Sequence, residues 1–144
     1  MIRDAQINDL PSISQIEKLC FVKPYKDEEL IYELKENPVS LYLVYEIDNQ
    51  IVGFIDFWIT FDSSTIAQIA VHPSFRRRGI ALALLNEALN ECIAKKASTM
   101  TLEVRVGNTA AIGLYEKFGF KSVVIKPHYY DNGEDALYMV KEVK

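Results

Sequence analysis

The sequence predicts a single α/β domain with a mixed, mostly antiparallel sheet of about seven strands flanked by about four helices. A chain of 144 residues is long enough to bury one core without crosslinks. Short runs rich in β-branched and aromatic residues alternate with segments of helical periodicity, which is typical of one sheet layer covered by helices. No repeat or long linker interrupts this order, so residues 1–144 are expected to form one domain.

The N-terminal part is expected to hold one short strand, residues 2–6, and two helices. Ile13, Ile16 and Cys20 recur at helical spacing and predict the first helix. This helix is expected to end near Phe21. The second helix stops at Asn37-Pro38, since the residue before a proline avoids the helical region. The expected caps of these helices are Asn8 or Asp9 for the first and Asp27 for the second.

Three strands should follow, at residues 41–47, 51–59 and 65–71, with a tight hairpin at residues 48–50 between the first two. The longest helix is expected over residues 79–96, with an apolar stripe formed by Leu82, Leu85, Leu89 and Cys92. The remaining elements are a strand at 100–106, a short helix capped by Asn108 and closed by Gly119, and strands at 120–126 and 136–143.

Composition excludes several classes of function. The formal net charge of −4 argues against nucleic acid as the main partner, because phosphate-binding surfaces usually carry a basic excess. The sequence has no long apolar run and no signal-peptide core, which predicts a cytoplasmic protein without a membrane segment. Cys20 and Cys92 are expected to be buried free thiols, with a disulfide or a catalytic cysteine as the alternative. His72 and His128 lack metal-ligand spacing, so no metal is expected.

Three adjacent arginines, Arg76, Arg77 and Arg78, precede the longest predicted helix and follow a predicted strand. Cations are disfavoured at the positive end of a helix unless an anion lies between them and the free N–H groups. Gly79 lets the backbone approach a bulky ligand, and the small Ala81 leaves the first turn uncovered. We therefore expect a diphosphate ligand here, while a solvated basic turn is the alternative.

This segment, Arg76-x-x-Gly79-x-Ala81 after Ile69-Ala70-Val71, resembles the pyrophosphate-binding motif of the GCN5-related N-acetyltransferases. The resemblance implies acetyl-CoA as the acetyl donor. Backbone N–H groups of residues 77–82 would hold its diphosphate, and the strand would pair with its pantetheine arm. The residues expected to bind the cofactor are Ile69, Ala70, Val71, Arg76, Arg77, Arg78, Gly79, Ile80, Ala81, Leu82 and Asn108.

Downstream segments sharpen the resemblance. Residues 101–105, the run from Asn108 to Phe120 and residues 128–136 closely resemble the RimI-type ribosomal-protein alanine N-acetyltransferases. The loop Phe21 to Tyr25 departs from that pattern, because RimI-type enzymes commonly carry a shorter Pro-Trp step there. The loop borders the acceptor side in the family, so the identity of the acceptor is the least secure part of the resemblance.

Glu103 is the expected general base. On a strand it shares a face with Thr101 and Arg105, while the other face, formed by Leu102, Val104 and Val106, packs against the core. The chemistry needs a base because an amine attacks a thioester only when unprotonated. The alternative is a surface glutamate paired with Arg105 or another neighbour.

Tyr115 lies on the apolar face of the short helix, which is typical of a core tyrosine. In the resembled family the matching tyrosine protonates the leaving thiolate, and that role is expected here. Asn108 is expected to cap the helix and, by resemblance, to contact the pantetheine arm. Tyr129, Tyr130 and Glu134 are candidates for binding the acceptor, with exposed aromatics beside a solvated turn as the alternative.

The expected function is thus acetyl-CoA-dependent acetylation of the N-terminal α-amine of a protein by direct attack in a ternary complex, with a small-subunit ribosomal protein as the acceptor. One rival keeps the chemistry but changes the acceptor to protein lysine, a polyamine or another small amine. A second rival is a non-catalytic module that binds acetyl-CoA.

Overall fold

The computed structural model describes residues 1–143, which form one seven-stranded sheet in the order β1-β2-β3-β4-β5-β7-β6. Neighbouring strands are antiparallel except β4 and β5, which are parallel. This confirms the predicted fold class. The strands are β1 Ile2–Asp4, β2 Ser40–Ile47, β3 Gln50–Thr60, β4 Ser63–Val71, β5 Thr99–Arg105, β6 Lys121–Lys126 and β7 Ala136–Glu142.

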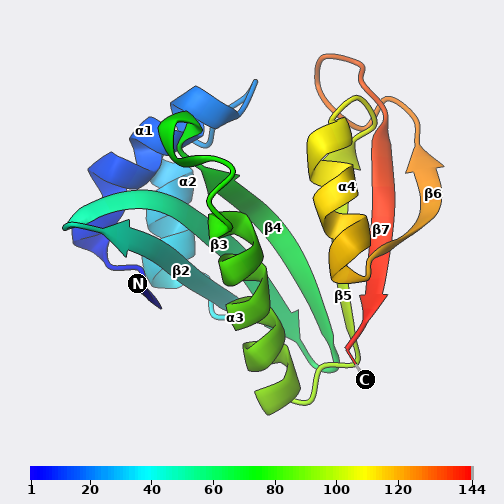
Figure 1. The fold of residues 1–144 in the computed structure, drawn as a ribbon, viewed down its shortest axis with the longest axis horizontal. Coiled ribbons are helices and arrows are strands. Elements are labelled where there is room, and N and C mark those ends of the chain that lie inside the picture. Colours follow the sequence, from blue (N-terminus) through cyan, green and yellow to red (C-terminus); the bar gives the residue numbers. More distant parts are fainter. Residues whose placement is uncertain (144) are drawn as a thin grey trace.

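Helices cover both faces of the sheet (Figure 1). The α-helices are α1 Leu10–Cys20, α2 Asp27–Ile31, α3 Ile80–Ala94 and α4 Thr109–Phe118. Three short turns of other helix types complete the chain: η1 Ile7–Asp9, η2 Tyr32–Glu36 and η3 Pro73–Phe75. Helices α1 and α2 lie on one face, against β2 to β4, and α3 and α4 lie on the other (Figure 1).

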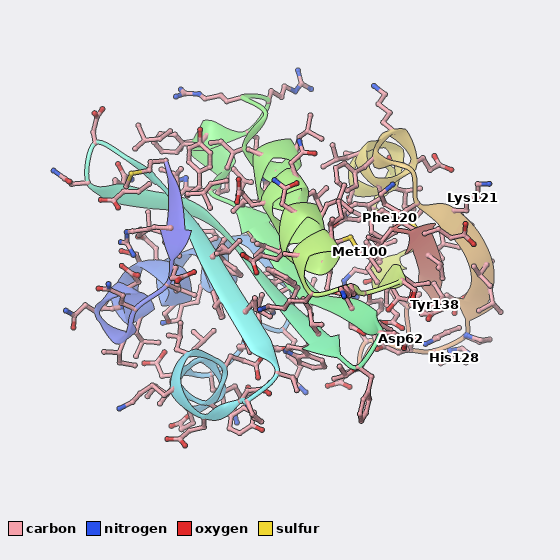
Figure 2. The ribbon with its side chains drawn as sticks, turned by 90° about the horizontal axis from the view of Figure 1, so that it is seen from below. Asp62, Met100, Phe120, Lys121, His128 and Tyr138 are labelled. Carbon is pink, nitrogen blue, oxygen red and sulfur yellow. The ribbon has the colours of Figure 1, made fainter. Side chains whose placement is uncertain are left out.

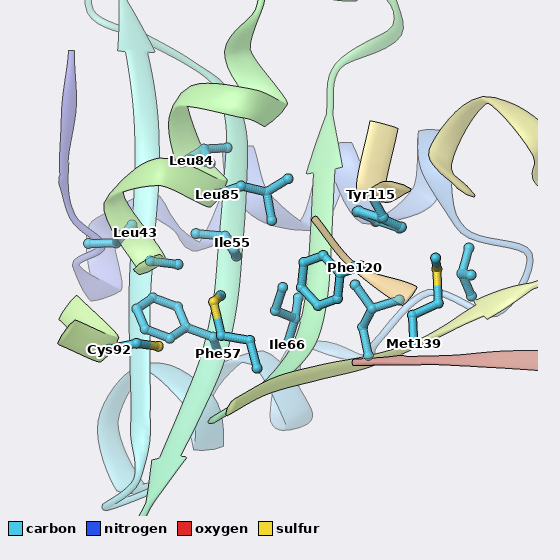
Figure 3. Close-up of a cluster of buried hydrophobic side chains, with 14 of the residues drawn as sticks. Leu43, Ile55, Phe57, Ile66, Leu84, Leu85, Cys92, Tyr115, Phe120 and Met139 are labelled. Carbon is cyan, nitrogen blue, oxygen red and sulfur yellow. The ribbon is translucent and has the colours of Figure 1, made fainter. Parts of the chain in front are cut away.

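Each face has its own apolar core. Under α1 and α2, Ile13, Ile16 and Leu30 pack against Val44 and Phe54. On the other face a larger cluster runs from α3 across the sheet to α4, as Figure 3 shows with Leu84, Leu85 and Cys92 at one end and Tyr115, Phe120 and Met139 at the other. The second cluster joins both halves of the sheet.

Two predicted helix features were wrong in detail. Asp9 occupies the cap position of α1, but its carboxylate bonds to Arg3 and to the Gln6 N–H instead of to the helix. Asp27 is the first residue of α2 and not its cap, and it accepts a hydrogen bond from Ser14 Oγ at 3.1 Å. Both carboxylates therefore tie α1 to neighbouring segments.

The apolar stripe of α3 is shifted from the predicted one. Leu82 is exposed, whereas Ile80, Leu84, Leu85, Ala88 and Cys92 are buried. Ile80 and Leu84 pack beside Gly53 of β3, where an added Cβ would lie 3.1 Å from the Ala70 carbonyl oxygen and 3.2 Å from Ile80 Cγ2. This close approach presses the start of α3 onto the sheet.

The sheet opens between its two parallel strands. Within the described chain, β4 and β5 pair over Ser63–Thr65 and Thr99–Thr101 only. Beyond Thr65 the strands diverge, and they run up on either side of a gap in Figure 1. A β-bulge at Ala67 accompanies the divergence, because Phe57 pairs with Ile66 while Asp56 pairs with Gln68. The cavity described below lies at this opening between β4 and β5.

Candidate active site

A cavity of about 490 Å³ lies where β4 and β5 diverge. Its walls come from residues 66–69 of β4, 102–105 of β5, the loop after α1 and the loop between β6 and β7. Asn108 and Tyr115 line it from α4. Figure 2 shows the β6–β7 side of the molecule, with Tyr138 on β7 and His128 at the start of the loop. The cavity therefore lies between segments that are far apart in the sequence.

The wall from β4 has a strand edge without a ladder partner, on which the Val71 carbonyl accepts hydrogen bonds from Arg76 and Cys20 side chains. Antiparallel pairing with β3 occupies one edge of Ile69, Ala70 and Val71, while the edge toward β5 has no ladder partner within residues 1–143. Ile69 lines the cavity, and Ala70 points to the opposite face, where it is buried in the α1 core. An extended ligand could add to this edge as a strand does.

The helix start next to β4 has the geometry of an anion site. Gly79 caps α3 with φ +76°, a left-handed conformation, and an added Cβ would meet nothing within 4 Å. Ala83 N donates to the Gly79 carbonyl at 3.0 Å, so the N–H groups before it have no partner within the helix. The structure thus leaves room and donors at the predicted diphosphate position.

The three arginines have different surroundings. Arg76 Nε donates to the Val71 carbonyl at 3.3 Å, and its Nη2 lies 3.4 Å from Cys20 Sγ. Arg78 lies over the Phe75 ring at 5.0 Å from the centroid, and Arg77 adopts a left-handed φ of +64°. Of the other predicted cofactor residues, the Ile80 side chain is buried in the core and the Leu82 side chain is exposed. Because its side chain is buried, Ile80 can contact a ligand only through its backbone N–H.

Glu103 lies on the cavity face of β5, as predicted, and its side chain is 19% exposed. Its partner is Lys126 of β6, whose Nζ donates to Glu103 Oε2 at 2.7 Å. Arg105, the partner considered from the sequence, pairs instead with Glu134 at 2.9 Å. Sequence reasoning missed Lys126, because its position depends on the register of β6 against β7 and of β7 against β5.

Tyr115 projects from α4 into the core, where its ring meets Phe120 edge-on at 5.9 Å (Figure 3). Burial raises the pKa of Tyr115 well above its usual value, so the hydroxyl stays protonated at neutral pH. Tyr115 also lines the cavity. A protonated phenol therefore borders the same space as Glu103.

Asn108 caps α4 as predicted. Its Oδ1 accepts a hydrogen bond from the Ala111 N–H at 3.2 Å, and the helix ends at Gly119 with φ +110°. Asn108 also lines the cavity. The cap role is confirmed, and the side chain lies where a bound ligand could reach it.

The acceptor candidates lie at the mouth of the cavity. Tyr129 and Tyr130 both line it and pack edge-on at 5.1 Å, and the Arg105 guanidinium lies 3.9 Å from the Tyr130 centroid. Burial raises the pKa of Tyr130 to about 12. Glu134 is not part of the cavity wall, and it holds Arg105 in place through their ion pair.

The loop after α1 completes the mouth. Phe21, Val22 and Tyr25 line the cavity, and Lys23 forms an ion pair with Asp131 of the β6–β7 loop. None of these residues was predicted as a site residue, although the loop itself was expected to border the acceptor side. Their spacing has no pattern that could have identified them individually.

The fold and its relatives define the class of protein as an acyltransferase. The chain belongs to the Acetyltransferase (GNAT) family, which matches residues 10–120. Members of this family use acetyl-CoA as the acetyl donor.

Full-length relatives narrow the comparison. The [ribosomal protein bS18]-alanine N-acetyltransferase of Salmonella typhimurium is 34% identical over 134 residues, which cover 91% of this chain and 89% of the relative. A Bacillus subtilis protein that carries this name provisionally is 39% identical over 139 residues, covering 96% and 92%. An N-alpha-acetyltransferase of Sulfurisphaera tokodaii is 37% identical over 153 residues, covering 96% and 90%.

Solved structures share the complete fold. The ribosomal-protein-S18-alanine N-acetyltransferase from Escherichia coli superposes with a TM-score of 0.91 at 29% identity, covering all of this chain and 94% of the other. Ard1 from Thermoplasma volcanium superposes with a TM-score of 0.94 at 30% identity, covering 100% and 97%.

No helix among the described residues 1–143 is long and apolar enough to cross a membrane. No group of three or more histidine, cysteine, aspartate or glutamate side chains in that range could hold a metal ion.

Proposed function

We propose that this protein transfers the acetyl group of acetyl-CoA to the N-terminal α-amine of a protein, by direct attack in a ternary complex. The observation that carries the proposal is the opening between β4 and β5, which joins a free strand edge to a cavity containing Glu103 and Tyr115. The acceptor is a small-subunit ribosomal protein that begins with alanine, as the names of the Salmonella and Escherichia coli relatives suggest. The proposed place of action is the cytoplasm.

The chain can hold the donor through two sets of backbone groups. The free edge of Ile69 to Val71 pairs with the extended arm, and the N–H groups of residues 77–82 bind the linked phosphates. Asn108 contributes its side-chain amide beside the arm. Bound acetyl-CoA supplies a thioester carbonyl that an amine can attack. Gly79 keeps the phosphate position free of a side chain.

Glu103 prepares the amine for attack. An α-amine has a pKa of about 7.7 to 8.0, so roughly a tenth to a sixth of it is neutral at pH 7, whereas less than about one part in a thousand of lysine is neutral. A single carboxylate, directly or through a water molecule, is therefore enough help for an α-amine. The carboxylate of Glu103 faces the cavity and can accept the proton at Oε1 while Lys126 holds Oε2.

Tyr115 holds the second proton needed for the reaction. Its hydroxyl is protonated at neutral pH because burial disfavours the phenolate. The proton at Tyr115 Oη can pass to the departing sulfur, and solvent can return it. A thiolate is a good leaving group even without an acid, so loss of this hydroxyl should slow the reaction without abolishing it.

A panel of acceptors tests the proposal. Purified protein with labelled acetyl-CoA should acetylate peptides with a free N-terminal alanine in preference to lysine peptides with a blocked N-terminus and to polyamines. Glu103→Gln combined with Tyr115→Phe should lower kcat by about a hundredfold or more. Acetylation confined to lysine or polyamine would overturn the acceptor, and absence of turnover with every amine would favour a module that only binds acetyl-CoA.

A further inference from the structure

A row of buried and half-buried polar side chains lies at the β4 wall of the cavity. Tyr42 of β2, Asp56 of β3 and Gln68 of β4 are successive cross-strand partners, so their side chains share the face covered by α1. Glu17 of α1 is fully buried over this row. Each of the four carries one buried oxygen without a hydrogen-bond partner among the described residues, which are Glu17 Oε2, Tyr42 Oη, Asp56 Oδ2 and Gln68 Oε1.

The other oxygen of Glu17 connects this row to the acceptor side. Glu17 Oε1 accepts a hydrogen bond from the Tyr25 N–H at 2.8 Å and one from Gln68 Nε2 at 3.2 Å. Tyr25 belongs to the loop that forms the mouth, and Gln68 lies beside the bulge in β4. Both residues line the cavity, so one buried carboxylate bonds to two of its walls.

Core packing alone does not require a carboxylate at this position. A charge buried in an α-helix against a sheet costs free energy unless hydrogen bonds compensate it, and an apolar side chain of similar size would avoid that cost. The two hydrogen bonds that Glu17 accepts are therefore its specific contribution, and both end on residues of the cavity wall.

We propose that Glu17 is a positioning residue for the acceptor, which holds the loop Phe21 to Tyr25 and Gln68 in the geometry that receives the N-terminal peptide. This inference rests on the proposed function, because it assigns the acceptor to the side of the cavity formed by that loop. Protonation of Glu17 weakens the hold on the Tyr25 N–H, since a neutral carboxyl is a weaker acceptor than a carboxylate. Acceptor affinity should then decline as the pH falls.

The surroundings of Glu17 place this change near neutral pH. Burial raises the pKa of Glu17 to about 7, and the hydrogen bonds from Tyr25 and Gln68 oppose that rise. No basic side chain forms an ion pair with Glu17 in the part of the chain that the structure describes. The titratable groups facing it are Cys20 on its own helix, Tyr25 in the loop, Glu29 on α2, Tyr42 on β2 and Asp56 on β3.

Nuclear magnetic resonance tests the connection without any turnover. In the unmodified protein the Tyr25 amide resonance should titrate with a midpoint near pH 7. In Glu17→Gln this titration should disappear, because glutamine can still accept from the Tyr25 N–H but does not ionise. A Tyr25 resonance that does not move between about pH 5.5 and 8.5 in the unmodified protein would overturn the proposal.

Kinetics test the effect on the acceptor. The acceptor's own amine titrates in the same range, but its contribution cancels when the KM of the unmodified protein is divided by that of Glu17→Gln at each pH. This ratio should rise roughly three- to tenfold from pH 8 to pH 6, since a hydrogen bond to a charged group is weakened. The KM for acetyl-CoA should not show this change.

Tyr42→Phe is the matched control, because it removes a polar group from the same row without touching the loop. It should leave the pH dependence of the acceptor KM unchanged, and an equal loss of that dependence would point to the row as a whole and overturn the role of Glu17. A flat KM ratio together with normal turnover would also defeat the inference. Titration of the Tyr25 resonance without turnover on any α-amine would instead defeat the proposed function.

Discussion

Lys126 Nζ donates to Glu103 Oε2 at 2.7 Å, which joins the edge strand β6 to the carboxylate proposed as general base. The two residues come from strands that are not adjacent, since β7 lies between β5 and β6. Lys126 also lies 4.5 Å from the ring centroid of Tyr138, the cross-strand partner of Glu103. This arrangement fixes the direction of Glu103 Oε2.

Replacing Lys126 by methionine should lower kcat modestly. The ion pair is partly exposed and is screened by water, so a loss of no more than about tenfold is expected. Glu103→Gln should cost about a hundredfold or more if it removes the base. Because Lys126 acts through Glu103, the double variant should be no slower than Glu103→Gln alone. Additive losses in this double-mutant cycle would show that Lys126 has an independent role.

Replacing Gly79 by alanine should weaken acetyl-CoA binding and reduce stability. A left-handed φ of +76° costs an ordinary L-residue about 1–2 kcal/mol, although the surroundings leave space for a Cβ. Gly79→Asn is the matched control, because asparagine tolerates this conformation better. We expect thermal denaturation to show recovery in Gly79→Asn, while calorimetry shows weak binding in both variants. Full binding in Gly79→Asn would mean that a side chain does not obstruct the phosphate position.

Asn108 can be tested for its two roles separately. Asn108→Ala should destabilise the protein by about 1 kcal/mol, because the Ala111 N–H loses its cap. Asn108→Asp preserves the cap and should restore the free energy of unfolding measured in urea. If the side-chain amide also contacts the donor, the KM for acetyl-CoA should stay elevated in both variants. Recovery of that KM in Asn108→Asp would leave the residue with a structural role alone.

Asp56 should make the protein less stable as the pH rises. Burial, and after it the neighbouring Glu33 carboxyl group, raise its pKa to about 9 from 3.8, so the folded state retains a proton that the unfolded chain has released. The stabilisation is complete below pH 3.8 and is lost as the pH rises through about 9. Glu17 adds to the same trend up to about pH 7.

Urea denaturation at several pH values between about 5 and 9 measures this slope. Asp56→Asn cannot ionise and still offers an oxygen to Ser40 Oγ, which donates to Asp56 Oδ1 at 2.7 Å. Its free energy of unfolding should therefore decline less steeply above pH 7. Parallel slopes for the two proteins would contradict the assignment of the buried proton to Asp56.

Much of the fold could be predicted from local sequence. The hairpin after β2 follows from Asp48 and Asn49, which both adopt positive φ values, 49° and 63°, as the tight turn requires. Alternation along residues 99–105 correctly placed Leu102 in the core and Glu103 toward the cavity. These features depend on neighbours in the chain, which local patterns describe well.

Tertiary pairing could not be predicted in the same way. Asp9 looked like a helix cap, but Arg3 offers its carboxylate two charged hydrogen bonds at 2.9 Å. In the sequence Lys126 is only the last residue of a predicted strand, and the strand order β5-β7-β6 is what brings it to Glu103. Glu17 lies within an ordinary amphipathic helix, and only the fold shows that it contacts both Tyr25 and Gln68. Such relations involve residues distant in sequence.

The short parallel pairing of β4 with β5 has a consequence for the lifetime of the protein in the cell. Three residue pairs at one end join the two parts of the sheet, and the larger apolar cluster and the Lys23–Asp131 ion pair also connect them. A donor bound along the open edge, as proposed, would connect the two parts where β4 and β5 no longer pair. At about a hundred times its dissociation constant, such a ligand adds about 2.7 kcal/mol to the free energy of unfolding. Protease resistance should therefore follow the supply of acetyl-CoA.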